Sequence, residues 1–131
     1  KNEDQWSCLL RGAGKINCMA VNALSNIVAI PLRQGTIHFI DTRCQKFAHV
    51  SVSPGHAVTA ASASTNDGNI FVFSGEGCTV KVWDIRKHSV LHSISVKSPQ
   101  LHSCDSITSI SSYDDQGGLV FGTMGGAIFS S

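Results

Sequence analysis

The sequence predicts an all-β fold built from repeated four-stranded antiparallel units. Short apolar runs are separated by clusters of Gly, Asn, Asp and Ser, which is typical of consecutive strands joined by turns. The apolar residues show little of the spacing that a helix requires. The chain of 131 residues is 42% hydrophobic and 15% charged, a composition that can bury a core and argues against disorder.

The predicted strands recur at a nearly constant interval. Asn26–Arg43 aligns without a gap on Asn69–Arg86, 43 residues further along, and Leu119–Phe129 forms a third copy. A matching strand precedes each copy, at Ile16–Val21, Val58–Ser62 and Ile107–Ser111. A period of about 40–50 residues with four short strands per unit predicts the blades of a β-propeller.

The second unit shows the pattern most fully. Ile70–Phe73 is apolar at every position, as expected of a strand covered on both faces. Thr79–Val82 alternates between polar and apolar residues, which suits a strand nearer the outer half of a blade. Three glycines fall between strand runs, where a tight hairpin needs a residue that tolerates positive φ: Gly35, Gly77 and Gly125.

Two dipeptides of the second unit resemble those of a known family. Gly55-His56 is followed by Trp83-Asp84, with 26 residues between the His and the Trp, which resembles the Gly-His … Trp-Asp punctuation of WD repeats. The resemblance implies a hydrogen-bonded set of His, Ser/Thr, Asp and Trp that stiffens each blade. The set is incomplete here, because Gly75 and Gly77 replace its Ser/Thr and Asp. The residues given a structural role are His56, Trp83, Asp84, Asp41 and Thr123.

The register divides residues 1–131 into a partial WD-repeat propeller. We expect blades at about 15–50, 57–96 and 107–131, the last incomplete, and an outer strand of a preceding blade at Trp6–Leu10 within 1–14. Propellers have 4–8 blades, and uncapped blades would expose apolar end faces. The opening Lys1–Gln5 lacks an initiator Met and a signal-peptide core. We therefore expect a piece of a longer chain that supplies the remaining blades, with a complete small all-β domain as the alternative.

Several function classes find no support in the residue patterns. The net charge of +1 argues against nucleic-acid binding, and Arg86-Lys87-His88, the one segment that approaches a basic cluster, is better explained as charged turn residues. His88 with His92, and His102 with Cys104, supply fewer than the three or four ligands of a zinc site. No nucleophile elbow or phosphate-binding loop occurs, so we expect no enzyme and no cofactor. Five cysteines without a C-x-x-C pair favour an intracellular protein, cytoplasmic or nuclear, and no apolar run is long enough for a membrane span.

The resemblance to WD repeats implies a non-catalytic scaffold that binds proteins or peptides. One rim would carry the loops that enter each blade and the hairpins between the second and third strands, where recognition usually lies. Its candidate partner-binding residues are Arg11, Lys15, Arg33, Gln34, Glu76, His102 and Met124. Each of these residues could equally be ordinary solvent-facing turn chemistry.

The opposite rim offers a more specific alternative. Trp83-Asp84-Ile85-Arg86 resembles the Trp-Asp-x-Arg box of WD-repeat substrate receptors that dock on a cullin ubiquitin-ligase adaptor, and Ile40-Asp41-Thr42-Arg43 is a degenerate second copy. In that reading Arg43 and Arg86 reach the adaptor. In the structural reading each Arg pairs with an acidic neighbour at the turn. A propeller attached to an enzyme in a longer chain is the remaining alternative.

Overall fold

The computed structural model describes residues 6, 8–12, 14–32, 36–43, 46–51, 58–75, 79–87, 89–95, 106–113 and 117–131, and these residues form an all-β structure. The strands of the first sheet are β1 (Ala20–Asn22), β2 (Ile27–Pro31), β3 (Thr36–Asp41) and β4 (Lys46–Ser51). Those of the second sheet are β5 (Val58–Ala63), β6 (Ile70–Gly75), β7 (Thr79–Asp84) and β8 (Ser89–Ser95). The third sheet contains β9 (Ile107–Ser112), β10 (Leu119–Thr123) and β11 (Ile128–Ser130). The predicted all-β fold class is confirmed.

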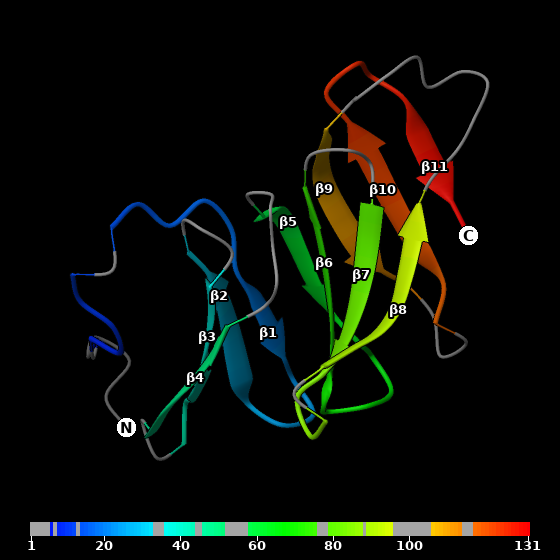
Figure 1. Ribbon diagram of the computed structural model, residues 1–131. Helices are drawn as coiled ribbons and strands as arrows, with labels where there is room; N and C mark the ends of the chain where they lie inside the picture. Colours follow the sequence, from blue (N-terminus) through cyan, green and yellow to red (C-terminus); the bar gives the residue numbers. More distant parts are fainter. Residues whose placement is uncertain are drawn as a thin grey trace.

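Each sheet is an antiparallel meander in which consecutive strands are neighbours. The strand orders are β1-β2-β3-β4, β5-β6-β7-β8 and β11-β10-β9. Figure 1 shows the three sheets following one another, from blue and cyan through green and yellow to orange and red. Small antiparallel sheets of three or four strands are the building units of a propeller.

The first and second sheets pack face to face through large side chains. Phe71 and Phe73 of β6 and Trp83 of β7 bury one face of the second sheet against Phe39 and Ile37 of β3. The rings of Phe39 and Phe71 meet edge to face, with centroids 5.4 Å apart. Because side chains alternate along a strand, Val72 between the two Phe residues faces the other way, and all three are buried. The prediction that Ile70–Phe73 is covered on both faces is thereby confirmed for its last three residues.

The second and third sheets meet through smaller side chains. Ala60, Val72 and Val80 of the second sheet pack against Ile107, Ile110 and Phe121 of the third. Two polar contacts cross the same boundary. The hydroxyl of Thr59 donates to the carbonyl oxygen of Ile107 at 2.6 Å, and the hydroxyls of Ser62 and Ser112 lie 3.4 Å apart.

The two end faces differ from the predicted pair of bare apolar surfaces. On the first sheet, Val28, Ile30 and Ile40 are buried because Leu10 and Leu32 pack on them. The far face of the third sheet carries mostly small or polar residues, because Phe121 points to the second sheet and its neighbours alternate away from it. By the strand register this far face comprises Ser109, Ser111, Val120, Gly122, Ile128 and Ser130.

Two local predictions need correction or stay open. The positive φ of the β10–β11 turn falls at Gly126, with φ of 89°, and not at Gly125. The described residues of Trp6–Leu10 form no strand here, and Leu10 instead contributes its side chain to the cover of the first sheet. A strand needs a neighbour to pair with, so a pairing of Trp6–Leu10 with a preceding blade stays a prediction.

Candidate functional site: a rim of paired Asp and Arg turns

Five turns gather at one end of the three sheets. They join β1 to β2, β3 to β4, β5 to β6, β7 to β8 and β9 to β10, and they share one end because consecutive antiparallel strands reverse direction. The turn at Gly68 packs closely on the first sheet, since a Cβ there would lie 3.1 Å from the Cβ of Ser25. We call the described residues of these five turns the Asp–Arg rim.

The β7–β8 turn holds Arg86 in a fixed geometry. The Arg86 guanidinium donates two hydrogen bonds to Asp84, Nε to Oδ1 at 3.1 Å and Nη2 to Oδ2 at 2.9 Å, and the Arg86 backbone N–H also donates to Oδ1 at 2.9 Å. The Asp84 side chain is only 2% exposed, whereas that of Arg86 is 57% exposed. The hydrogen bond from Arg86 holds the pKa of Asp84 below its usual value, against the opposing effect of burial. The same bond raises the pKa of Arg86.

The β3–β4 turn repeats this geometry. Arg43 donates through its backbone N–H and Nε to Oδ1 of Asp41, at 2.9 and 3.2 Å, and through Nη2 to Oδ2 at 3.0 Å. The Asp41 side chain is 26% exposed and that of Arg43 is 64% exposed. The structure therefore places both predicted Arg residues on one exposed rim and also pairs each with its acidic neighbour.

A buried Asn ties the first two sheets together at the same rim. Asn22 at the end of β1 is fully buried, and its side-chain amide donates to the backbone carbonyls of Asp67, at 2.9 Å, and Ile70, at 3.4 Å. Its Oδ1 accepts the backbone N–H of Leu24. Asp67 in turn contacts Arg86, with Oδ2 3.5 Å from Nη2. One polar network thus connects the first sheet with the Asp84–Arg86 turn.

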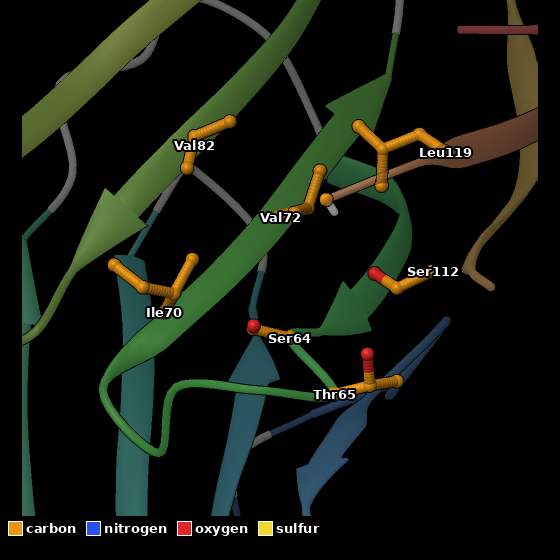
Figure 2. Close-up of a pocket in the computed structure, with 8 residues that line it drawn as sticks. Ser64, Thr65, Ile70, Val72, Val82, Ser112 and Leu119 are labelled. Carbon is orange, nitrogen blue, oxygen red and sulfur yellow. The ribbon is translucent and has the colours of Figure 1, made fainter. Parts of the chain in front are cut away.

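A pocket opens between the second and third sheets at this rim (Figure 2). Aliphatic side chains of both sheets form its walls, and the hydroxyls of Ser64, Thr65 and Ser112 lie toward the lower side of the close-up. Its lining residues are Ser64, Thr65, Ile70, Val72, Val82, Ser112, Gly117 and Leu119. The pocket is predominantly apolar with polar groups at its edge, a combination that suits the side chain of a binding partner.

Two known proteins resemble parts of this chain. It is 35% identical to Ribosome biogenesis protein YTM1 of Scheffersomyces stipitis over 71 residues, which are 52% of this chain and 15% of that protein. It is 29% identical to WD repeat-containing protein 81 of Danio rerio over 93 residues, 71% of this chain and 4% of that protein. No family model matches the chain. The second relative carries the WD repeats that the Trp83-Asp84 dipeptide and the small antiparallel sheets indicate. The chain is similar to WD-repeat proteins.

The hydrogen-bonded set that the resemblance to WD repeats implies is incomplete in this chain. Trp83 is 3% exposed, and its buried indole N–H has no partner among the described residues. Gly75, at the position of the family's Ser/Thr, carries no hydroxyl that could accept this bond. Thr123 occupies the corresponding position of the third sheet and is buried, but its hydroxyl accepts the backbone N–H of Ala127 within its own turn. His56 lies outside the described residues.

The partner-binding residues predicted for the other rim, which lies opposite the Asp–Arg rim, are only partly described. Arg11, Lys15 and Met124 are exposed, and Met124 is 73% exposed in the turn between β10 and β11. Four further candidates lie outside the described residues: Arg33, Gln34, Glu76 and His102. Their role in binding stays a prediction.

Sequence reasoning missed the residues that connect the sheets at the Asp–Arg rim. Asn66-Asp67-Gly68 is a recognisable turn signal, but nothing local indicates that Asn22 bonds to this turn 45 residues away. A buried Asn at the end of a short apolar strand is the only local hint, because a buried amide requires partners.

Two absences can be stated for the described part of the chain, one of a ligand cluster and one of a membrane-spanning helix. Within the described ranges, no three His, Cys, Asp or Glu side chains lie close enough together to hold a metal ion. None of the described segments is a helix with the length and apolar character that a membrane crossing needs.

Proposed function

We propose that this chain is part of a non-catalytic protein-interaction scaffold within a longer WD-repeat propeller. The supporting observation is the repeated turn of the Asp–Arg rim, in which Arg43 and Arg86 take the same bidentate geometry on neighbouring sheets. A guanidinium already held by a carboxylate loses little rotamer freedom when a partner binds. Arg is also enriched at protein interfaces. The rim is therefore preorganised to bind a protein or peptide.

The wider assembly follows from the short matches. The chain spans 15% and 4% of the lengths of the two relatives described above, so the proposal places the remaining blades in the same longer chain. The division into blades at about 15–50, 57–96 and 107–131 belongs to this proposal. One relative is named for ribosome biogenesis, a process that takes place inside the cell, and we propose an intracellular location in the cytoplasm or nucleus.

Cross-linking mass spectrometry on the parent protein in its native complexes tests the scaffold. The variant Arg43→Gln/Arg86→Gln removes the two arginines of the Asp–Arg rim that are paired with Asp41 and Asp84. The control Arg11→Gln/Lys15→Gln removes two cations from the opposite side of the fold. We expect partner cross-links to be lost in the first variant and kept in the second. Loss in the control alone would move the binding surface to the opposite rim. Unchanged cross-links in both would refute the proposal that rim cations recruit the partner.

A second candidate is a substrate receptor that docks on a cullin ubiquitin-ligase adaptor. It is favoured by the Trp83-Asp84-Ile85-Arg86 sequence together with the exposure of Arg86 and Arg43 at one end of the sheets. One observation opposes this candidate, because each guanidinium is already hydrogen-bonded to its own Asp. Co-precipitation of the purified adaptor with the parent protein tests it. Binding should be lost in Arg86→Ala and kept in Arg11→Ala, and an adaptor that does not bind the parent protein rules the candidate out.

The third alternative is a propeller attached to an enzyme. The described residues supply no argument for catalysis by this part of the chain. A catalytic domain elsewhere in the parent chain would support this alternative, and the parent's full sequence is the observation that tests it.

A further inference from the structure

We infer that Asp67 converts to isoaspartate without an enzyme, which makes the β5–β6 turn of the Asp–Arg rim a site of covalent modification. The inference goes beyond the proposed scaffold function and does not depend on it. Asp67-Gly68 is the single Asp-Gly dipeptide of the sequence, which contains no Asn-Gly dipeptide. These two dipeptides form cyclic imides most readily, because glycine has no side chain to hinder the ring closure.

The reaction requires only these two residues and water. The backbone nitrogen of Gly68 attacks the side-chain carboxyl carbon of Asp67, and a C–N bond forms while the amide proton and the carboxyl OH leave as water. Water then opens the resulting five-membered succinimide at either carbonyl. Opening at the side-chain carbonyl restores Asp67. Opening at the backbone carbonyl leaves the chain running through the side-chain carbon, beside a free α-carboxylate. The net change is an isomerisation, so no oxidant or reductant is consumed.

Packing against the first sheet retains this reactive dipeptide. A Cβ at Gly68 would lie 3.1 Å from the Cβ of Ser25 and 3.4 Å from its backbone nitrogen. A larger residue, which would slow the ring closure, would therefore have to displace the neighbouring turn. The Asp67 side chain is 38% exposed. None of the described residues accepts a hydrogen bond from the Gly68 N–H. Water can thus reach the carboxyl group, and the attacking nitrogen is not held by another bond.

The contacts of Asp67 control how often the two groups meet. Its Oδ1 accepts the backbone N–H of Asn69 at 2.9 Å, and its Oδ2 lies 3.5 Å from Nη2 of Arg86. Its carbonyl oxygen accepts the Asn22 amide at 2.9 Å, and its N–H donates to the hydroxyl of Ser64, which turns back onto this turn. Ring closure requires the carboxyl group to rotate onto the following nitrogen, so the two carboxylate contacts must break. The folded turn should therefore react through local opening, more slowly than an unfolded chain.

Conversion would alter the polar network of the Asp–Arg rim. In the isoaspartyl form the former side-chain carbonyl belongs to the backbone, which adds one atom to the chain within the β5–β6 turn. The carbonyl of Asp67 that accepts the Asn22 amide and the Ile70 N–H becomes part of a carboxylate on a side group. The connection from the first sheet to Arg86 passes through Asp67, so the modification breaks it at its central residue.

Incubation of the intact parent protein at body temperature and neutral pH tests the inference. Isoaspartate is located by mass spectrometry of proteolytic peptides and quantified with isoaspartyl methyltransferase, which moves a methyl group from S-adenosylmethionine to the new α-carboxylate. A synthetic peptide of residues 61–74 gives the rate of the unrestrained sequence. We expect isoaspartate at residue 67, formed about tenfold more slowly than in the peptide, as when opening costs one or two hydrogen bonds. The variant Asp67→Glu should accept no methyl group at this turn, because its six-membered ring closes far more slowly.

Four variants of the parent protein separate local opening from global unfolding. Arg86→Gln removes the contact to Oδ2 of Asp67 and should speed the reaction about threefold, in line with an exposed ion pair. Asn22→Ala removes the bond to the Asp67 carbonyl and should speed it about tenfold. Arg43→Gln is the matched control, because it changes the equivalent arginine of the first sheet. Phe71→Ala weakens the core between the sheets. These last two variants should react at the rate of the parent.

The inference fails if the parent protein holds no isoaspartate at residue 67 once the peptide has converted, or if another aspartate converts faster. Equal rates in the parent, Arg86→Gln and Asn22→Ala would overturn the control by the Asp67 contacts. Acceleration by Phe71→Ala as large as that by Asn22→Ala would overturn it as well, because the reaction would then pass through global unfolding. The scaffold proposal is decided separately, by the cross-links of the Arg43→Gln/Arg86→Gln variant.

Discussion

The first and second sheets meet through aromatic side chains, while the second and third meet through aliphatic side chains and hydroxyl groups. Phe39, Phe71, Phe73 and Trp83 fill the first boundary, and Asn22 closes its rim end with bonds to the next sheet. The second boundary contains Phe121 as its one fully packed aromatic residue among those described, and its rim end is a pocket. The comparison indicates that the first boundary is more completely filled by side chains than the second, which keeps a pocket at its rim end.

The largest expected difference between the boundaries is in core packing. Phe71 is fully buried at the first boundary and Val72, its neighbour in sequence, is 4% exposed at the second. Phe71→Ala should lower the free energy of unfolding by about 3–5 kcal/mol, and Val72→Ala by about 2 kcal/mol, because the cost grows with the cavity left behind. Urea unfolding of the parent protein measures both. Equal losses would show that the two boundaries contribute equally and would remove the basis of the comparison.

Polar links give a smaller test of the same contrast. Asn22→Ala removes the two hydrogen bonds that the buried amide donates to the carbonyls of Asp67 and Ile70 and the one that it accepts from the Leu24 N–H. We therefore expect a loss of about 2–3 kcal/mol in the free energy of unfolding. Thr59→Val removes a single hydroxyl bond, to the carbonyl of Ile107 across the second boundary, and should cost about 1 kcal/mol. The same urea titrations provide the values. A larger loss for Thr59→Val would make the second boundary the one that depends on polar bonds.

The strands were largely predictable, because each depends on its own apolar pattern and on the turn residues beside it. Ile70–Phe73 and Thr79–Val82 lie in β6 and β7. The glycine with positive φ was misplaced by one residue, at Gly125 instead of Gly126, because two adjacent glycines leave a local pattern without a basis for choosing. The role of Asn22 was not predictable, since it depends on which turn of the next sheet lies beside it.

The candidate site was predictable only in its repeated part. The matching Asp-x-Arg sequences at Asp41 and Asp84 indicated two Arg residues at equivalent turns, and the structure shows both pairs in the same geometry. The pocket follows from the size of side chains on two different sheets and from the inward turn of Ser64. The pocket depends on how two separate segments pack against each other, so the residue pattern of either segment alone could not predict it.

The smallest expected effect distinguishes the β3–β4 and β7–β8 turns, the two turns of the Asp–Arg rim that contain an Asp–Arg pair. Asp84 has a 2% exposed side chain and Asp41 a 26% exposed one, although each binds its Arg in the same way. Asp84→Asn should cost about 1–2 kcal/mol at pH 7, since hydrogen bonds to charged groups contribute most when buried. Asp41→Asn should cost about 0.5 kcal/mol, as expected of an ion pair that water screens.

The pH dependence of the difference between the parent protein and Asp84→Asn tests the cause. Arg86 lowers the pKa of Asp84 in the folded protein, so the carboxylate stabilises the fold above its unfolded pKa, and that contribution is lost as the pH falls through the lowered folded value. Urea unfolding between pH 7 and pH 3, as about the range over which carboxylates titrate, should therefore show the penalty of Asp84→Asn shrinking at the acidic end. A penalty that stays constant would mean that the introduced amide disturbs packing and that the Asp84 charge contributes little. In that case the buried carboxylate would not distinguish the second sheet's turn from the first.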